Sequence, residues 1–288
     1  MTYSELYRIG TDILSGAGIP EAALDARLLL EFITGCDRTR LLARPDTPVD
    51  DKDAEDYRKL VAKRSEHIPL QQLTGICNFM GIDFEVNDKV LIPRQDSECL
   101  VEEAMRYISD GSDILDLCCG SGCLLLSLMH YKNNCRGVGV DISEDVLNIA
   151  NNNLEAIRQD DGLNGGEAVF LKGDLYDALS EHDRKFDFII SNPPYIRSDV
   201  IDTLMPEVRD HEPRVALDGG SDGLDFYRRI ISAAPAHLAN YGMIFLEIGF
   251  DQAEDVTQIL EFAHFTDILV TKDYGGCDRV VVARYIHK

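Results

Sequence analysis

The sequence predicts an α/β protein in which a mostly parallel sheet follows a small helical domain and a β-hairpin. Three observations support this prediction. Residues 1–75 carry apolar side chains at helical spacing, residues 76–92 form short extended runs, and strands alternate with helices from residue 93 onward. We therefore expect a helical domain (1–75), a hairpin linker (76–92) and an α/β domain (93–288).

The helical domain is expected to contain three amphipathic helices. Apolar stripes mark the first two, at Leu6, Ile9, Ile13 and Leu14 and then at Leu24, Leu28, Leu29 and Phe32. The third helix runs from about Asp50 to Ser65, with an acidic first turn and a basic last turn that complement the helix dipole. We interpret these helices as a small bundle.

The α/β domain is expected to hold seven strands. Strands are predicted at 113–117, 137–141, 168–172, 186–191 and 243–248, with helices at about 122–131, 144–157, 223–239 and 251–263. Two further strands, near 265–271 and 279–285, are joined only by the segment KDYGGCD. Because so short a connection cannot hold a crossover helix, the last two strands should be antiparallel. A purely parallel dinucleotide-binding sheet would not end in this way.

Composition excludes several classes of protein. A formal net charge of −23 weighs against nucleic acid as substrate, because polyanion binding needs a positive surface. The eight cysteines show no paired spacing, so we expect reduced thiols and no metal site. No apolar run approaches the roughly 18 residues that span a bilayer, and the N-terminus lacks a signal-peptide core. We expect a cytoplasmic protein that does not bind membranes.

The segment DLCCGSG, residues 116–122, lies between a predicted strand and a predicted helix. Gly120 and Gly122 allow the backbone to approach a ligand closely, and the helix start offers unpaired N–H groups. In open α/β sheets, ligands bind beyond the carboxyl ends of the strands. This turn is therefore the predicted centre of a cofactor site.

Acidic residues follow three successive predicted strands. Asp141 is placed to accept hydrogen bonds from both ribose hydroxyls of a nucleoside cofactor. Asp174 could accept from the exocyclic amine of adenine, with Leu175 against the ring. Asp116 suits the ammonium group of a methionine-like tail, and Leu125 stands where a dinucleotide site needs a third glycine. The pattern favours S-adenosylmethionine over a nicotinamide dinucleotide.

The segment Asn192-Pro193-Pro194-Tyr195 follows the fourth predicted strand. Because proline has no N–H, nearby carbonyl groups stay free as acceptors. The side-chain oxygen of Asn192 and the carbonyl of Pro193 could each accept one N–H of an NH₂ group, while Tyr195 covers its planar face. An alcohol could satisfy only one of these acceptors. The sequence therefore predicts methyl transfer to a planar amide or amine nitrogen.

With these residues, the chain closely resembles the PrmC/HemK family, the N5-glutamine methyltransferases of peptide chain release factors. The resemblance covers essentially the whole length and is carried by PLQQLTG (69–75), LIPRQDSE (91–98), DLCCGSG (116–122), GVDIS (139–143), GDLY (173–176), NPPY (192–195), EPRVALDGGSDGLDFY (212–227) and DRVVVAR (278–284). NPPY is shared with adenine-specific DNA methyltransferases. The LIPRQDSE and EPRVALDGG segments are much more specific to this family.

The resemblance implies a Rossmann-like seven-stranded class I methyltransferase sheet, with the glutamine of a Gly-Gly-Gln motif as substrate. It implies cofactor contacts from Cys118, Cys119, Gly120, Ser121, Gly122, Asp141, Leu175 and Asn192, and substrate contacts from Asn192, Pro193, Pro194 and Tyr195. Two departures are visible. Cys118 and Cys119 replace the usual Gly and Thr of the loop, and Leu175 stands where some relatives have an aromatic residue.

The LIPRQDSE segment also allows a physical interpretation. Arg94 is a candidate for holding the substrate loop or the carboxylate of the cofactor. Asp96 or Ser97 could cap a helix that begins near Glu98.

Three alternatives remain open from the sequence. The same motifs could serve an adenine N6 methyltransferase acting on nucleic acid, although the net charge of −23 opposes this. A glutamine methyltransferase of a ribosomal protein would share nearly every motif. A non-catalytic cofactor-binding protein would be expected to have an altered NPPY segment, which here is intact. We expect a monomer whose partners are release factors. The helical domain is expected to bind a second surface of the release factor, and no direct contact with nucleic acid is expected.

Overall fold

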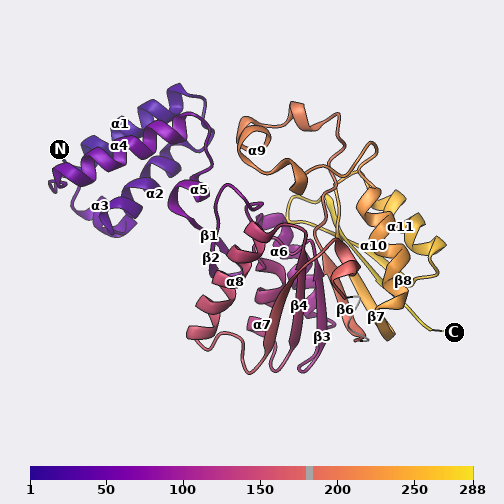
Figure 1. Ribbon diagram of the computed structural model, residues 1–288. Coiled ribbons are helices and arrows are strands. Elements are labelled where there is room, and N and C mark those ends of the chain that lie inside the picture. Colours follow the sequence, from indigo (N-terminus) through magenta and orange to yellow (C-terminus); the bar gives the residue numbers. More distant parts are fainter. Residues whose placement is uncertain (180–183, 288) are drawn as a thin grey trace. The chain divides into compact units, whose positions relative to one another are not determined.

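The computed structural model describes residues 1–179 and 184–287 (Figure 1). The chain forms two compact units. The helical unit combines Met1–Ile76 with Met205–His211, and the sheet unit combines Cys77–Leu204 with Glu212–Lys288. The sequence did not indicate that Met205–His211 packs with the helical unit. The division into a helical domain (1–75), a hairpin linker (76–92) and an α/β domain (93–288) remains a prediction. The two compact units describe how the chain packs and do not test the function of each part.

The helical unit is built from short helices around its own core. Its helices are α1 (Tyr3–Gly16), α2 (Ala22–Thr34), α3 (Arg38–Ala43), α4 (Asp51–Ser65), α5 (Leu70–Thr74) and α9 (Pro206–His211). The three predicted helices are confirmed, whereas the shorter α3, α5 and α9 were not predicted. A capping box formed by Thr2 and Glu5 begins α1, and Leu6, Leu29 and Tyr57 lie in the core.

A buried cluster of charges joins three helices of this unit. Arg64 on α4 is 4% exposed; its Nε lies 2.7 Å from Asp25 Oδ2 on α2, and its Nη2 lies 2.5 Å from Glu207 Oε1 on α9. Burial raises the pKa of Asp25, and the Arg64 charge opposes this rise. Because one guanidinium binds both carboxylates, Arg64 links α9 to α2 and α4 within the helical unit.

The sheet unit begins with the predicted hairpin and continues as a seven-stranded sheet. The strands are β1 (Ile76–Phe79), β2 (Ile82–Glu85), β3 (Asp113–Leu117), β4 (Arg136–Asp141), β5 (Glu167–Lys172), β6 (Phe186–Ser191), β7 (Leu238–Glu247), β8 (Thr266–Lys272) and β9 (Asp278–Arg284). The order in the large sheet is β5-β4-β3-β6-β7-β9-β8. β9 pairs antiparallel with both β7 and β8, which confirms the predicted antiparallel final pair.

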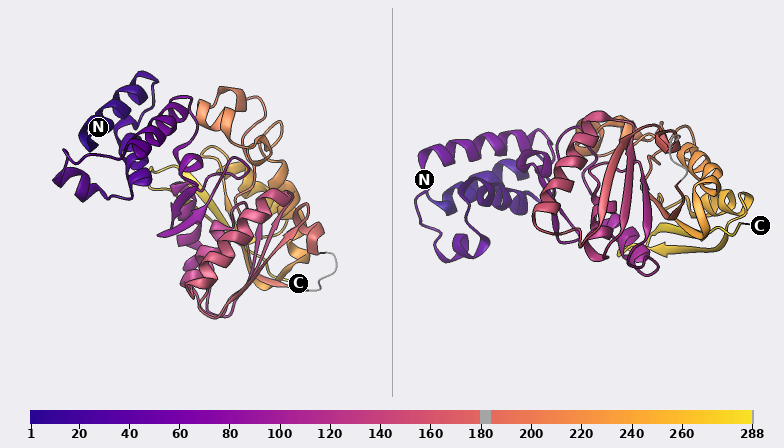
Figure 2. Two further views of the ribbon diagram at one scale, coloured as in Figure 1. Left: turned by 60° about the vertical axis from the view of Figure 1, so that its left-hand side comes forward. Right: turned by 60° about the horizontal axis from the view of Figure 1, so that its bottom comes forward.

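Helices cover both faces of the large sheet (Figure 2). These helices are α6 (Gln95–Met105), α7 (Cys123–Tyr131), α8 (Glu144–Gln159), α10 (Asp225–Ala233) and α11 (Ala253–Phe262). Ile114 belongs to the core under α6, α7 and α8, whereas Leu115 belongs to the core under α10 and α11. Side chains of successive strand residues point to opposite faces, so each strand contributes to both cores.

Two predicted element boundaries were wrong. The helix predicted at 223–239 ends at Ala233, because Pro235 lies in the following 3₁₀ turn and cannot continue the helical hydrogen bonding. Strand β7 then starts at Leu238 rather than near residue 243. Among the described residues, no helix is long and apolar enough to cross a membrane.

The start of α6 also differs from the prediction. The helix begins at Gln95 after Arg94, and no side-chain hydrogen bond caps it. Asp96 lies 3.5 Å from Arg279 instead, and the Ser97 hydroxyl accepts from Asn192. Both expected capping groups therefore bind side chains outside their own helix.

We predict that Arg64→Leu lowers the free energy of unfolding by about 3 kcal/mol, because it leaves Asp25 and Glu207 without their cation. Urea unfolding followed by circular dichroism measures this loss. Lys63→Leu is the control, since it removes a positive charge from an exposed position of the same helix. Equal stability of the two variants would contradict the role given to Arg64.

Candidate active site

A cavity of about 210 Å³ lies at the carboxyl edge of the sheet, where β3, β4, β5 and β6 end beside one another. Ligands of open α/β sheets bind at this edge. The lining comes from the segment before α6, the loop after β3, the ends of β4 and β5, the segment after β6, and α10. Its polar and charged residues are Lys89, Arg94, Ser97, Ser121, Asp141, Ser143, Asp174, Asn192 and Arg229.

The loop after β3 has the left-handed backbone that its glycines predict. Gly120 has φ +55° and Gly122 has φ +80°. A Cβ at Gly122 would lie 2.7 Å from the Phe170 ring, so a larger residue does not fit there. Cys118 also has a positive φ, +59°, although it carries a side chain. The resemblance noted from the sequence implies a glycine at this left-handed position, where glycine carries no steric penalty.

Asp141 binds the loop from the end of β4. Its Oδ2 accepts from the Gly120 N–H at 3.1 Å, and its Oδ1 accepts from the Ser143 N–H at 3.0 Å. Burial raises the pKa of Asp141, and these backbone N–H groups oppose the rise. Asp141 lines the cavity, and each of its carboxylate oxygens can accept a further hydrogen bond, so the predicted contact with ribose hydroxyls remains chemically available.

Asp174 and Leu175 both line the cavity, at the end of β5. The Asp174 Oδ2 lies 2.7 Å from Nη2 of Arg229 on α10, a partner that the sequence did not indicate. The same guanidinium lies 5.8 Å from the centroid of the Phe226 ring, which also lines the cavity. Asp174 therefore has a cationic neighbour in addition to its predicted contact with adenine.

Three cysteines also line the cavity, namely Cys118, Cys119 and Cys123. Burial raises the pKa of all three thiols well above the usual range, so the thiols stay protonated and unreactive at neutral pH. All eight cysteines of the chain are free. In the described part of the chain, no group of three or more His, Cys, Asp or Glu side chains is arranged to hold a metal ion.

Asp116 does not line the cavity. It is fully buried, and neither carboxylate oxygen has a hydrogen-bond partner among the described residues. Burial raises the pKa of this carboxyl. The contact of Asp116 with an ammonium group, directly or through water, therefore remains a prediction.

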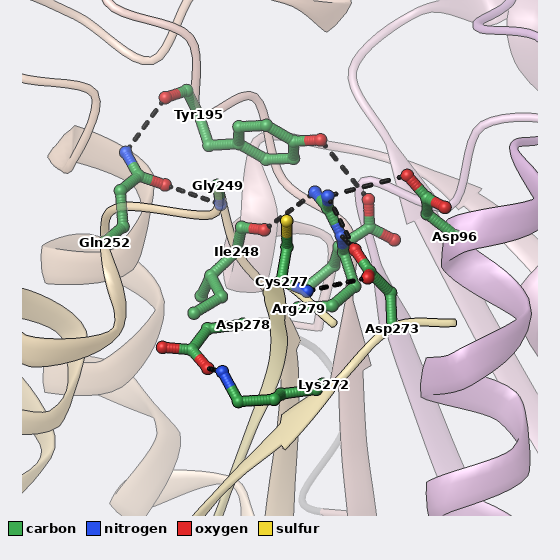
Figure 3. A network of polar contacts seen from close by, with 11 residues as sticks. Asp96, Tyr195, Ile248, Gly249, Gln252, Lys272, Asp273, Cys277, Asp278 and Arg279 are labelled. Atoms are coloured by element: carbon green, nitrogen blue, oxygen red, sulfur yellow. Dashed lines mark hydrogen bonds and ion pairs between the residues drawn. The ribbon is translucent and has the colours of Figure 1, made fainter. Parts of the chain in front are cut away.

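The Asn192–Tyr195 segment is only partly exposed to the cavity. Asn192 and Pro194 line it, whereas Pro193 and Tyr195 do not. The Tyr195 hydroxyl donates to Glu247 Oε1 at 3.4 Å, and the Tyr195 carbonyl accepts from Gln252 Nε2 at 3.0 Å (Figure 3). Tyr195 is thus held at both its ends. The predicted stacking of its ring on the substrate remains a prediction.

Arg94 lines the cavity but already has an anionic partner. Its Nη2 lies 2.6 Å from Oε1 of Glu212, and Glu212 is 7% exposed. An ion pair with a buried carboxylate fixes the guanidinium, so its other N–H donors are the ones available to a ligand. A role toward the substrate or the cofactor carboxylate remains a prediction.

Sequence reasoning missed several residues of the cavity. Ser97, Phe226 and Arg229 were not assigned to the site, although all three line it. Ser97 lies in LIPRQDSE and Phe226 lies in EPRVALDGGSDGLDFY, two segments that carry the family resemblance, whereas Arg229 lies two residues beyond the second segment. The motifs could have indicated Ser97 and Phe226, whereas neither a motif nor periodicity indicated Arg229.

Comparisons with known proteins agree with this geometry. A family model described as the PrmC N-terminal domain matches residues 5–75, and one described as a methyltransferase domain matches residues 114–211. The release factor glutamine methyltransferase of Geobacter sulfurreducens is 40% identical over 271 residues, which cover 94% of this chain and 92% of that protein. The Clostridium botulinum enzyme of the same name is 38% identical over 286 residues, 99% of each chain.

The chain belongs to the release factor glutamine methyltransferase family. A solved methyltransferase structure from Pyrococcus furiosus shares 18% identity, with a TM-score of 0.51 over 72% of this chain and 90% of that one. This similarity shows the fold alone. The protein is therefore an S-adenosylmethionine-dependent methyltransferase with the class I sheet.

The residues of the cavity fit S-adenosylmethionine. The left-handed loop exposes backbone to the cavity, Asp141 supplies carboxylate acceptors, and Leu175 supplies an apolar surface. When bound, this cofactor supplies an electrophilic methyl group on a sulfonium. The cavity lining holds the carboxylates of Asp141 and Asp174 beside the cationic side chains of Lys89, Arg94 and Arg229.

We predict that Asp141→Ala weakens binding of S-adenosylhomocysteine by at least about tenfold, because it removes an anionic hydrogen-bond acceptor and frees the Gly120 loop. Isothermal titration calorimetry measures the dissociation constant. Asp145→Ala is the matched control, since Asp145 is exposed and does not line the cavity. Unchanged affinity in Asp141→Ala would remove Asp141 from the cofactor site.

Proposed function

We propose that this enzyme transfers a methyl group to the side-chain amide N5 of the glutamine in the Gly-Gly-Gln motif of peptide chain release factors. The products are N5-methylglutamine and S-adenosylhomocysteine. One observation carries the proposal: the Asn192 side chain lies at the cavity, and its Nδ2 is bound to Ser97 Oγ at 3.3 Å. Its Oδ1 is thereby the end of the amide left for a substrate.

Asn192 and Pro193 are proposed to bind the substrate amide together. Asn192 Oδ1 accepts one N–H of the glutamine NH₂, and the Pro193 carbonyl accepts the other. A carboxamide nitrogen is a weak nucleophile because its lone pair is delocalised. Acceptors on both N–H bonds stabilise the charge that develops as the nitrogen attacks, and they fix its orientation. A hydroxyl group leaves one of the acceptors unpaired, which disfavours alcohols.

The segment after Tyr195 supports this arrangement through close backbone packing. The Ile196 N–H donates to the Leu217 carbonyl at 2.9 Å, and the Gly219 N–H donates to the Ile196 carbonyl at 2.8 Å. A Cβ at Gly219 would lie 2.7 Å from Tyr195 Cα, so glycine is required there. The family-specific LDGG segment therefore fixes the backbone that follows the substrate-binding residues.

We further propose that the helical unit binds a second surface of the release factor. Its α3 helix exposes Leu42, which is 70% exposed, between the exposed Arg40 and Arg44. Exposed apolar side chains flanked by arginine are typical of protein interfaces. Because the helical unit has a core of its own, it can present this surface independently of the sheet unit.

The same proposal includes a cytoplasmic, monomeric enzyme that makes no direct contact with nucleic acid. The net charge of −23 supports the absence of contact with nucleic acid, because the negative electrostatic potential of the protein repels a polyanion. The same charge disfavours adenine N6 methylation of nucleic acid. A non-catalytic binding protein is disfavoured because the NPPY segment is intact.

We predict that a release factor incubated with the enzyme and S-adenosylmethionine gains about 14 Da, the mass of one CH₂, on the glutamine of its Gly-Gly-Gln motif. Mass spectrometry of the digested factor locates the modification. Asn192→Ala should reduce the rate by about a hundredfold or more, since one acceptor of the amide is lost, while S-adenosylhomocysteine still binds.

Two results would contradict this assignment. Methylation of a residue other than that glutamine would refute the proposed substrate. Turnover at the wild-type rate in Asn192→Ala would refute the role of the side chain.

A further inference from the structure

Gln252 lies directly before α11, and its side chain binds three separate segments of the sheet unit. The residue is 6% exposed. Its Nε2 donates to the Tyr195 carbonyl at 3.0 Å and to the Gly223 carbonyl at 3.2 Å. Its Oε1 accepts from the Gly249 N–H at 2.9 Å (Figure 3). One buried carboxamide therefore joins the segment after β6, the loop before α10 and the segment after β7.

The direction of this carboxamide follows from partners whose own hydrogen-bonding roles are fixed. Backbone carbonyl groups only accept, and backbone N–H groups only donate. The Tyr195 and Gly223 carbonyls therefore require the NH₂ end of Gln252, and the Gly249 N–H requires its oxygen end. Both hydrogens of the NH₂ group are used. A side chain of similar size without donors would leave both carbonyl groups without this partner.

The contact between these segments is close enough to require glycine at position 223. Gly223 has φ +76°, and a Cβ there would lie 2.5 Å from the Tyr195 carbonyl oxygen and 2.7 Å from Gln252 Nε2. Both distances are shorter than van der Waals contact, so a larger residue would push the Tyr195 carbonyl and Gln252 apart. Gly223 belongs to EPRVALDGGSDGLDFY, and this contact gives that glycine a structural reason.

Two of the joined segments line the cavity. The segment after β6 contributes Asn192 and Pro194, and α10 contributes Phe226 and Arg229, which together are called the α10 wall. Gln252 itself does not line the cavity. Because it binds the backbone next to both segments, it fixes the distance between the proposed substrate acceptors and the α10 wall. Methyl transfer requires reacting atoms about 3–3.5 Å apart and in line, so a small change in this distance slows the step.

We propose that Gln252 is a positioning residue of the methyl transfer, which holds the substrate-binding segment Asn192–Tyr195 at a fixed distance from the α10 wall. It acts through the Tyr195 and Gly223 carbonyls and contacts neither substrate nor cofactor. The inference rests on the proposed function for the identity of the substrate. The order of the joined segments can be measured without that substrate.

Backbone hydrogen bonds hold the same segments together at other points. The Ile196 N–H donates to the Leu217 carbonyl at 2.9 Å. The Ser198 N–H donates to the Gly220 carbonyl at 3.0 Å. Neither bond involves α11 or the segment after β7. Loss of the Gln252 donors should therefore loosen the contact between the segments and leave the rest of the sheet unit folded.

Steady-state kinetics with a release factor as substrate test the proposal. Gln252→Met removes both donors at similar side-chain size and should lower kcat about tenfold or more, because the reacting atoms are no longer held in line. The KM for the release factor and the dissociation constant of S-adenosylhomocysteine should each change less than about threefold, since Asn192 and Asp141 are still present. Gln258→Met is the control, because it makes the same change at an exposed position of α11.

A second variant disturbs the same contact from the opposite side. Gly223→Ala keeps Gln252 but places a methyl group against its Nε2 and the Tyr195 carbonyl, so it should lower kcat by a similar factor. Gly111→Ala is its control, since Gly111 has φ +81° and a Cβ there meets nothing within 4 Å. The loss in the double variant Gln252→Met/Gly223→Ala should be smaller than the product of the two single losses, because both act on one contact.

Hydrogen–deuterium exchange tests the contact independently of activity. In Gln252→Met, the amides of Ile196, Ser198 and Gly219, which bond between the two segments, should exchange at least about tenfold faster than in the wild type. Amides of β3 and β4 should keep their wild-type rates, and Gln258→Met should leave all of these rates unchanged. All comparisons are made well below the lowest melting temperature of the set.

The outcomes distinguish the positioning proposal from the proposed function. If the wild-type enzyme methylates no release factor, the proposed function fails, while exchange still reports on the contact. If the wild type is active and Gln252→Met keeps its kcat, the positioning proposal is overturned. Faster exchange throughout the sheet, an equal loss of S-adenosylhomocysteine affinity, or failure of both Gln252→Met and Gly223→Ala to fold overturns it as well, because Gln252 would then support the fold as a whole.

Discussion

The parallel order of four neighbouring strands is the constraint on which the site depends. Because β5, β4, β3 and β6 are adjacent and parallel, their carboxyl ends meet at one edge of the sheet. Residues that are far apart in the chain, such as Asp141, Asp174 and Asn192, thereby line one cavity. The antiparallel β9 fits beside β7 at the other side of the sheet and brings Arg279 close to Glu247, at the end of β7.

Burial then decides how the polar residues of this edge behave. Asp141 and Glu247 both have pKa values raised by burial, and each is held by donors from neighbouring segments. The three cysteines beside them stay protonated for the same reason, so they fill space as small apolar residues.

The sequence was sufficient to predict the parts of the fold that follow from periodicity and from turn chemistry. The strands from β3 to β6, the antiparallel final pair and the three longer N-terminal helices are where the apolar patterns placed them. The cofactor loop was predictable because left-handed turns need glycine and because ligands bind at the carboxyl ends of strands. These signals are local, and they do not depend on which distant segments come into contact.

The remaining features depend on contacts between distant residues, which a local pattern does not contain. Nothing near Glu207 indicates that its partner is Arg64, so the packing of α9 with the helical unit could not be predicted. The hydrogen bond from the Tyr195 hydroxyl to Glu247, which lies fifty-two positions further along the chain, could not be predicted either. The pairing of Asp174 with Arg229 was missed for the same reason.

The central claim is that Asn192 presents a carbonyl oxygen to a flat nitrogen group. A crystal structure of the enzyme with S-adenosylhomocysteine and a Gly-Gly-Gln peptide tests it most directly. The account predicts a distance of about 2.7–3.2 Å between Asn192 Oδ1 and the glutamine side-chain nitrogen, with Nδ2 still on Ser97. A glutamine nitrogen bound elsewhere in the cavity, or an Asn192 that turns Nδ2 toward the peptide, would contradict it.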